Sequence, residues 1–265
     1  MFKTRLISGI VLVAAALLVI ITGGWLLFAV TLALSLIGAF EFFRATGVRE
    51  EGKKFNALEL AGYLGIALYY ISLVVQWGSM QLMALITAIV VVMAVYVFTF
   101  PRYHADQVIA SYFAVIYVGV MLSFVYQTRM LQDGEYIVWL IFLCSWGCDT
   151  CAYCAGRLLG KHKMAPVLSP KKTIEGALGG VLGALILGIL YAVFTKGPVV
   201  EYAIICAIGA LISMIGDLAA SAIKRNKGIK DYGKLIPGHG GILDRFDSVI
   251  FTAPMIYFLA VMLIR

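Results

Sequence analysis

Nine long apolar runs dominate this sequence and leave few folds open to it. A helix needs about 20 apolar residues to cross the hydrocarbon core of a bilayer. The spans that we predict are residues 6–21, 25–43, 60–76, 80–98, 108–125, 136–154, 174–194, 199–223 and 248–264. Because every backbone polar group inside a bilayer must find a partner within the protein, such runs form helices. Together with a mean hydropathy of +0.98, they predict an all-α, polytopic integral membrane protein with about nine transmembrane helices.

The basic residues indicate how these helices are oriented. If the N-terminus is cytoplasmic and the chain alternates, 18 of the 21 Lys and Arg residues lie on the cytoplasmic side, and the other side holds Arg129, Lys196 and Arg265. Cytoplasmic loops accumulate Lys and Arg, so we predict this orientation. Lys3 and Arg5 before the first run are typical of a signal peptide, but a second run follows almost at once, and we predict a retained helix.

We predict three parts along the chain. Residues 1–43 form a transmembrane hairpin, and residues 57–130 carry few charges inside the membrane and form a scaffold. Residues 131–265 combine long cytoplasmic loops with carboxylates inside the predicted spans, so we expect the chemistry there. The net charge of +7 suits anionic lipid headgroups and nucleotide phosphates. Nucleic acid binding is not expected, because no soluble basic domain is present.

The segment from Ser221 to Asp247 carries an unusual density of charge for this apolar chain. Its basic side chains flank the glycine-rich sequence Gly238-His239-Gly240-Gly241, and its carboxylates are Asp231, Asp244 and Asp247. Cations beside carboxylates and exposed backbone N–H groups suit a polyphosphate with its metal ion. At His239 we favour a nucleotide contact over general-base catalysis, and Gly240 and Gly241 allow a ligand to approach the backbone closely.

Several carboxylates near this segment could bind Mg²⁺. Asp217, Ser221, Lys224 and Arg225 have the spacing of one helix face. Asp149 and Asp217 lie within spans, where an ionised group is expensive unless it is paired. Mg²⁺ usually takes one or two carboxylates plus phosphate oxygens and waters. The alternative is a set of buried salt bridges with the neighbouring Lys and Arg residues.

A second basic segment precedes the span at 174–194. We expect Ser169 to be the N-cap and Pro170 the first residue of that helix. Lys171 and Lys172 would then add charge to a helix N-terminus, which attracts anions. We favour a phosphate contact here over ordinary positive flanking of a span.

Two further patterns are interpreted as packing. Gly176/Gly180 and Gly179/Gly183 are spaced four apart, which is typical of closely packed helices. Cys144, Cys148, Cys151 and Cys154 invite a metal-cluster interpretation, but on one continuous helix the first and last would lie about 15 Å apart. We therefore interpret these cysteines as small packing residues.

The ordered motif over the last 130 residues resembles that of the phosphatidate cytidylyltransferase family, the CDP-diacylglycerol synthases. The motif residues are Ser221, Lys224-Arg225, Lys230-Asp231, Gly238-His239-Gly240-Gly241 and Asp244-Arg245-Phe246-Asp247, with Asp149, Ala152-Tyr153, Gly156-Arg157 and Ser169-Pro170-Lys171-Lys172-Thr173 before them. One departure is Cys151, where the family typically has glycine, which concerns local packing. The first 130 residues resemble the family only as generic membrane helices.

The resemblance implies transfer of CMP from CTP to phosphatidic acid, with release of pyrophosphate. It implies Mg²⁺, with a second cation as an option, and CTP, phosphatidic acid and bilayer lipid as partners. A homodimer and the bacterial inner membrane are further expectations. We expect Asp217, Lys224, Arg225 and Asp244 to be catalytic. Asp217, Asp244, Asp149 and Asp247 are the expected metal ligands. Substrate contacts are expected from Lys171, Lys172, Ser221, Lys227, Lys230, Asp231, His239, Gly240, Gly241 and Arg245.

Two other functions stay open at this point. A CTP-dependent lipid kinase of related architecture would transfer the γ-phosphoryl group to a lipid alcohol. An ion transporter could use Asp149 and Asp217 along its pathway, although transporters often have internal repeats and we find none in the sequence. The identity of the product distinguishes the three.

Overall fold

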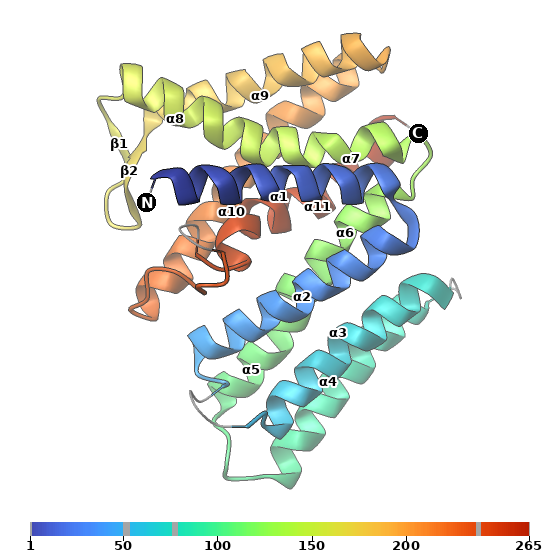
Figure 1. The fold of residues 1–265 in the computed structure, drawn as a ribbon. Coiled ribbons are helices and arrows are strands. Elements are labelled where there is room, and N and C mark those ends of the chain that lie inside the picture. Colours follow the sequence, from blue (N-terminus) through green and yellow to red (C-terminus); the bar gives the residue numbers. More distant parts are fainter. Residues whose placement is uncertain (1, 50–53, 76–78, 237–239, 265) are drawn as a thin grey trace. The chain divides into compact units, whose positions relative to one another are not determined.

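The protein consists mainly of long apolar helices. A computed structural model describes residues 2–49, 54–75, 79–236 and 240–264 (Figure 1). In this part of the chain, eight helices are long and apolar enough to cross a membrane, and Val13–Thr22 forms a shorter apolar helix. The predicted all-α, polytopic membrane protein of about nine helices is therefore confirmed.

The elements follow the predicted spans closely. Seven of the predicted spans each correspond to one α-helix. These helices are α1 (Phe2–Thr22), α2 (Gly24–Thr46), α3 (Ala57–Val75), α4 (Met80–Phe98), α9 (Ile174–Thr195), α10 (Val199–Asn226) and α11 (Leu243–Leu263). The other two are composite. One joins α5 (Ala105–Ala114), η1 (Val115–Val120) and α6 (Met121–Arg129), and the other joins α7 (Gly134–Phe142), η2 (Leu143–Gly147) and α8 (Cys148–Leu159).

The segments η1 and η2 are π-helical turns inside otherwise α-helical spans. Such turns change which face of the helix the following residues occupy, and they occur often at functional sites. The second one, η2, ends two residues before Asp149. This turn therefore helps to set the face of α8 on which Asp149 lies.

A short antiparallel hairpin lies between α8 and α9, where we predicted the start of a helix. Strand β1 (Lys163–Ala165) pairs with β2 (Ser169–Thr173), and Lys163 lies opposite Thr173. The prediction that Ser169 caps the helix and Pro170 begins it is wrong. The helix begins at Ile174, and the Thr173 side chain accepts the backbone N–H of Gly176 at 3.1 Å. Threonine also caps helices well, and proline fits an edge strand.

The described chain forms two compact units, which cut across the three predicted parts. The first takes in the described residues of Met1–Val19, Gly24–Ser123 and Lys227–Arg245. The second takes in those of Ile20–Gly23, Phe124–Asn226 and Phe246–Arg265. The division into hairpin, scaffold and catalytic part concerns function and stays a prediction.

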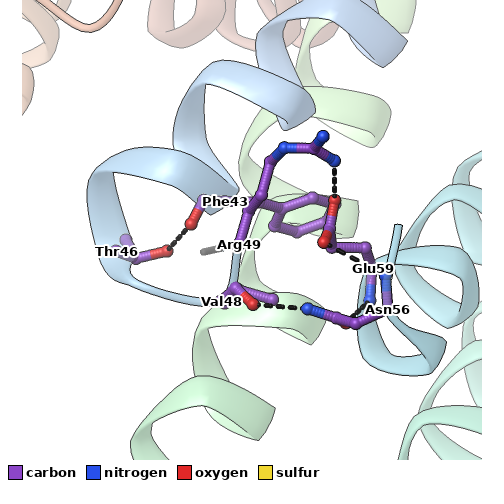
Figure 2. Close-up of polar contacts among 6 residues, drawn as sticks. All are labelled: Phe43, Thr46, Val48, Arg49, Asn56 and Glu59. Carbon is purple, nitrogen blue, oxygen red and sulfur yellow. Dashed lines mark hydrogen bonds and ion pairs between the residues drawn. The ribbon is translucent and has the colours of Figure 1, made fainter. Parts of the chain in front are cut away.

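Polar side chains in the first unit fasten the end of α2 to the start of α3 (Figure 2). Arg49 donates to Glu59 at 2.7 Å, and Asn56 donates to the carbonyl oxygen of Val48 at 2.7 Å. Asn56 and Glu59 also cap α3 reciprocally, since each side chain accepts the other's backbone N–H. Glu59 is fully buried, so the Arg49 guanidinium supplies the charge partner that burial requires.

Glycines bring α9 against α8 in the second unit, where the two helices run side by side (Figure 1). A Cβ at Gly179 would collide with Ala155, and one at Gly183 would collide with Cys151. The close packing predicted from the glycine spacing is confirmed. Cys151 is accommodated because Gly183 leaves space for its side chain.

Candidate active site

Helix α10 carries four of the predicted site residues in the second unit. Ser221 donates to Oδ1 of Asp217 at 3.5 Å, one helical turn away. Ser221 and Lys224 are buried, whereas Arg225, near the end of the helix, is exposed. The predicted shared helix face is therefore confirmed for Asp217, Ser221 and Lys224, whereas Arg225 faces away from the buried side of α10.

Lys172 of β2 brings a cation to this face of α10. Its Nζ forms an ion pair with Oδ2 of Asp217, and each side chain is about a quarter exposed, 26% for Lys172 and 25% for Asp217. Side chains that are a quarter exposed are accessible to a ligand, and their charges are only partly screened by water. The hairpin, rather than a helix N-terminus, is what places Lys172 beside the carboxylate.

A cavity of about 350 Å³ opens at the same place. Its charged lining comes from Asp149, Arg157, Lys171, Lys172 and Asp217, and its apolar lining includes Ala152, Tyr153, Met164, Ala177 and Met214. A pocket whose lining includes both cations and apolar groups suits an amphiphilic anion.

Asp247 completes the charged cluster of the second unit. It interacts electrostatically with Asp217, Lys224 and Asp149, and its Oδ1 accepts the backbone N–H of Ser248 at 2.8 Å. Gly216 permits this approach, because a Cβ there would lie 2.9 Å from the carbonyl oxygen of Asp247. Three predicted carboxylates and two lysines thus lie in one region.

The chemistry of these carboxylates fits Mg²⁺ only with help from a ligand. Within the described ranges, no group of three or more His, Cys, Asp or Glu side chains could hold a metal ion by itself. Mg²⁺ normally takes one or two carboxylates and completes its shell with phosphate oxygens and water. Asp149, Asp217 and Asp247 supply hard oxygen atoms of that kind, and their role as metal ligands stays a prediction.

Asp244 organises a loop of the first unit. Its Oδ2 accepts the backbone N–H groups of Tyr232 at 2.8 Å, Gly241 at 3.0 Å and Gly233 at 3.4 Å. The carboxyl group is buried, with 7% of the residue exposed. These contacts support a role in holding the loop, and the predicted metal role of Asp244 stays a prediction.

The remaining predicted contacts of the first unit lie at its surface or in the loop. Lys227, Lys230, Asp231 and Arg245 are exposed. Gly240 has a φ of +88°, a conformation that favours glycine, and Gly241 is buried. The prediction for His239 concerns a residue outside the described part of the chain.

Comparison with known proteins places these residues in a family. The sequence model of the cytidylyltransferase family matches residues 3–263. A phosphatidate cytidylyltransferase of Staphylococcus saprophyticus is 32% identical over 266 residues, which cover 98% of this chain and 99% of that protein. Proteins of the same name from Staphylococcus haemolyticus and Staphylococcus aureus (strain COL) are each 34% identical over the same shares of the chains. This chain belongs to the cytidylyltransferase family.

The match to the family extends beyond the region in which we saw the resemblance. Sequence motifs pointed to the last 130 residues, whereas the cytidylyltransferase match begins at residue 3. The first unit shows one reason why the N-terminal helices belong to the pattern. Residues of α2 contact the loop that carries the glycine-rich motif.

Two of these α2 residues were missed by the sequence analysis. Glu41 accepts the backbone N–H groups of Ile242 and Leu243, and Arg44 donates to the carbonyl oxygen of Tyr232 at 2.5 Å. A carboxylate within an apolar span was the signal that could have revealed Glu41. Glu41 lies within residues 1–43, the predicted hairpin, to which the sequence assigns no role in the reaction.

Proposed function

We propose that this chain transfers CMP from CTP to phosphatidic acid, giving CDP-diacylglycerol and pyrophosphate. The relatives that share its full length carry the name phosphatidate cytidylyltransferase. The observation that carries the proposal is the Lys172–Asp217 pair beside a cavity with both charged and apolar lining. This arrangement suits a lipid whose headgroup is a phosphate.

The reaction needs charge neutralisation more than proton transfer. An anionic oxygen of the lipid phosphate forms a bond to the α-phosphorus of CTP. The bond from that phosphorus to the oxygen bridging to the β-phosphorus breaks, and pyrophosphate leaves with the electron pair. The attacking oxygen carries no proton at neutral pH, so no general base is required. The obstacle is repulsion between anions, which fixed cations reduce.

The residues of the second unit take roles that follow from their charges. Lys171, Lys172 and Arg157 line the cavity and bind phosphate oxygens. Lys224 neutralises charge from its buried position on α10, and Ser221 orients Asp217. Asp217, Asp149 and Asp247 would hold Mg²⁺, which, when bound, supplies positive charge to the pyrophosphate group.

The first unit contributes contacts to phosphate through its loop and exposed cations. Lys227, Lys230 and Arg245 are available for this role, because all three are exposed. Backbone N–H groups of glycine-rich loops commonly bind phosphate oxygens. The proposed contacts to the nucleotide are His239, Gly240 and Gly241, together with Asp231. The N–H of Gly241 donates to Asp244, so Gly240 and His239 are the residues proposed to offer backbone N–H groups.

We place the basic loops in the cytoplasm and the protein in the bacterial inner membrane, and a homodimer stays a prediction. The charge distribution along the sequence supports the orientation. Labelling of single cysteines introduced at Lys171 and Lys230 should show both on the cytoplasmic face, and at Lys196 on the opposite face. Labelling of positions 171 and 230 from opposite faces would contradict this orientation.

CTP labelled at one phosphate tests the proposed reaction. Purified protein in vesicles that contain both phosphatidic acid and diacylglycerol should transfer the label from α-labelled CTP into lipid and release the label of γ-labelled CTP as pyrophosphate. A lipid kinase would instead transfer the γ-label to diacylglycerol. Transfer of neither label, by folded protein, would contradict both enzyme assignments and favour a transporter.

A further inference from the structure

A buried carboxylate inside α2 has no place in the reaction described so far. Glu41 lies in an apolar transmembrane helix, and only 3% of the residue is exposed. An ionised carboxylate in such a place is expensive unless hydrogen bonds compensate for the lost water. Its partners therefore indicate what it contributes.

Both carboxylate oxygens of Glu41 accept backbone N–H groups at the start of α11. Oε1 accepts from Ile242 at 3.0 Å, and Oε2 accepts from Leu243 at 2.9 Å. The first N–H groups of a helix have no partner within the helix. Glu41 thus caps α11 from a helix that lies about 200 residues earlier in the sequence.

The Glu41 carboxylate also lies against two glycines of the same loop. A Cβ at Gly233 or at Gly241 would come nearer than 3.0 Å to the carboxylate oxygens, and real Cβ atoms do not approach so closely. A Cβ at Gly233 would also lie 2.8 Å from the Cα atom of Gly241. The two glycines therefore give Glu41 the space to reach the backbone.

The neighbouring contacts fix the same segment at its other end. Arg44, one helical turn after Glu41, donates to the carbonyl oxygen of Tyr232 at 2.5 Å. Asp244 accepts the N–H groups of Tyr232 and Gly241, and the N–H of Ile236 bonds to the carbonyl oxygen of Gly240 at 2.8 Å. Helix α2 and Asp244 thereby hold both ends of the segment 232–243, which carries the glycine-rich motif.

We propose that Glu41 is a positioning residue that holds residues 232–236 and 240–243, the described flanks of the glycine-rich motif, in the arrangement that binds the phosphates of CTP. The inference rests on the proposed function, because it concerns the loop that we assign to nucleotide binding. Glu41 acts through the backbone of Ile242 and Leu243 and touches no substrate. Its loss should weaken nucleotide binding and leave lipid binding unchanged.

Glu41→Gln is the most direct test, since it keeps the size of the side chain. An amide retains one acceptor oxygen, but its NH₂ group meets a backbone N–H, so one donor loses its partner. An unpaired buried donor should lower the population of the loop conformation that Glu41 stabilises by roughly tenfold or more. We expect the KM for CTP to rise about tenfold or more, with the KM for phosphatidic acid unchanged. We also expect faster hydrogen exchange in the peptide that contains Ile242 and Leu243.

Glu59→Gln is the matched control. Glu59 is also a fully buried carboxylate in the first unit, but its partners are Arg49 and Asn56. This variant should keep the wild-type KM for CTP, whatever fraction of the protein folds, because KM does not depend on the amount of active enzyme. Gly233→Ala is a second test, since its Cβ would displace the Glu41 carboxylate at a residue with no proposed substrate contact, and it should reproduce the pattern of Glu41→Gln.

The outcomes separate positioning from general stability. If Glu41→Gln leaves the KM for CTP and the exchange of the 242–243 peptide at wild-type values, the inference is overturned. It is also overturned if both KM values rise equally. If wild-type protein forms no CDP-lipid, the proposed function fails, and the exchange measurement alone still decides whether Glu41 holds the loop.

Discussion

Lys172, the second residue of the Lys171-Lys172 pair on strand β2, forms an ion pair with Asp217 in the C-terminal half of transmembrane helix α10. The pair joins the two groups of residues that the sequence suggested separately, a basic segment and a helix with a carboxylate. It depends on the hairpin, because Lys172 lies on β2, two residues before α9 begins. A phosphate ligand in the adjacent cavity would meet a cation that is already positioned.

Removing the Lys172 charge should slow the reaction strongly. In Lys172→Met, kcat/KM should fall by roughly 10²-fold, which is typical of a lost donor to a developing anion. Lys172→Arg should recover part of the activity. Steady-state kinetics with phosphatidic acid and CTP measure the effect. Lys163→Met, an exposed lysine on the paired strand β1, is the control and should behave as wild type; equal loss in both variants would contradict a specific role.

The cap of α9 should contribute to stability. Thr173→Ala removes the acceptor for the Gly176 N–H and should destabilise the protein by about 1 kcal/mol. Thr173→Ser keeps the hydroxyl group and should lose much less. Thermal unfolding in detergent compares the variants. If Thr173→Ser were as unstable as Thr173→Ala, the lost methyl group rather than the cap would explain the effect.

The packing of α8 on α9 should tolerate no added methyl group at Gly179. Gly179→Ala places its Cβ against that of Ala155, so the helices must separate or shift, at a cost of roughly 1–3 kcal/mol. Gly9→Ala is the control, because nothing lies within 4 Å of a Cβ at that position. Thermal unfolding should show a lower midpoint for Gly179→Ala only. An unchanged unfolding midpoint for Gly179→Ala would contradict this prediction, because it would show that α8 and α9 accommodate the added Cβ without cost.

Lys224 and Arg225 should neutralise phosphate charge without selecting the base. Each alanine variant should lower kcat/KM, by roughly 10²-fold for a residue that stabilises the transition state. The preference for CTP over UTP should change little, because the two nucleotides carry the same phosphates. Kinetics with both nucleotides measure this preference. A variant that keeps full CTP turnover and accepts UTP would assign that residue to the base.

The helices could be predicted from the sequence because hydrophobic length is a local property. Span 80–98 was predicted with the same bounds as α4, and the glycine spacing predicted how α9 packs. The hairpin could not be predicted in this way. Ser169-Pro170 and Thr173 each satisfy the rules for starting a helix, and only the pairing of β1 with β2 decides between them.

The candidate site was predictable to the extent that its residues are charged and lie in the membrane. Asp149 and Asp217 were identified for that reason, whereas Asp247 was identified from the charged segment 221–247. All three share one region of the second unit. The contact between Lys172 and Asp217 depends on tertiary structure. Glu41 was missed because its partners are backbone N–H groups about 200 residues away, which no side-chain motif reveals.

The formation of CDP-diacylglycerol by Asp217→Asn protein tests most directly whether the Lys172–Asp217 cluster carries CMP transfer. The rate should be measured at saturating Mg²⁺ beside wild type and Asp106→Asn, an exposed carboxylate in the first turn of α5. Thermal unfolding in detergent should show that all three proteins are folded. We predict product from wild type and Asp106→Asn and a loss of roughly 10²-fold or more in Asp217→Asn. Near-normal turnover of folded Asp217→Asn would contradict the account.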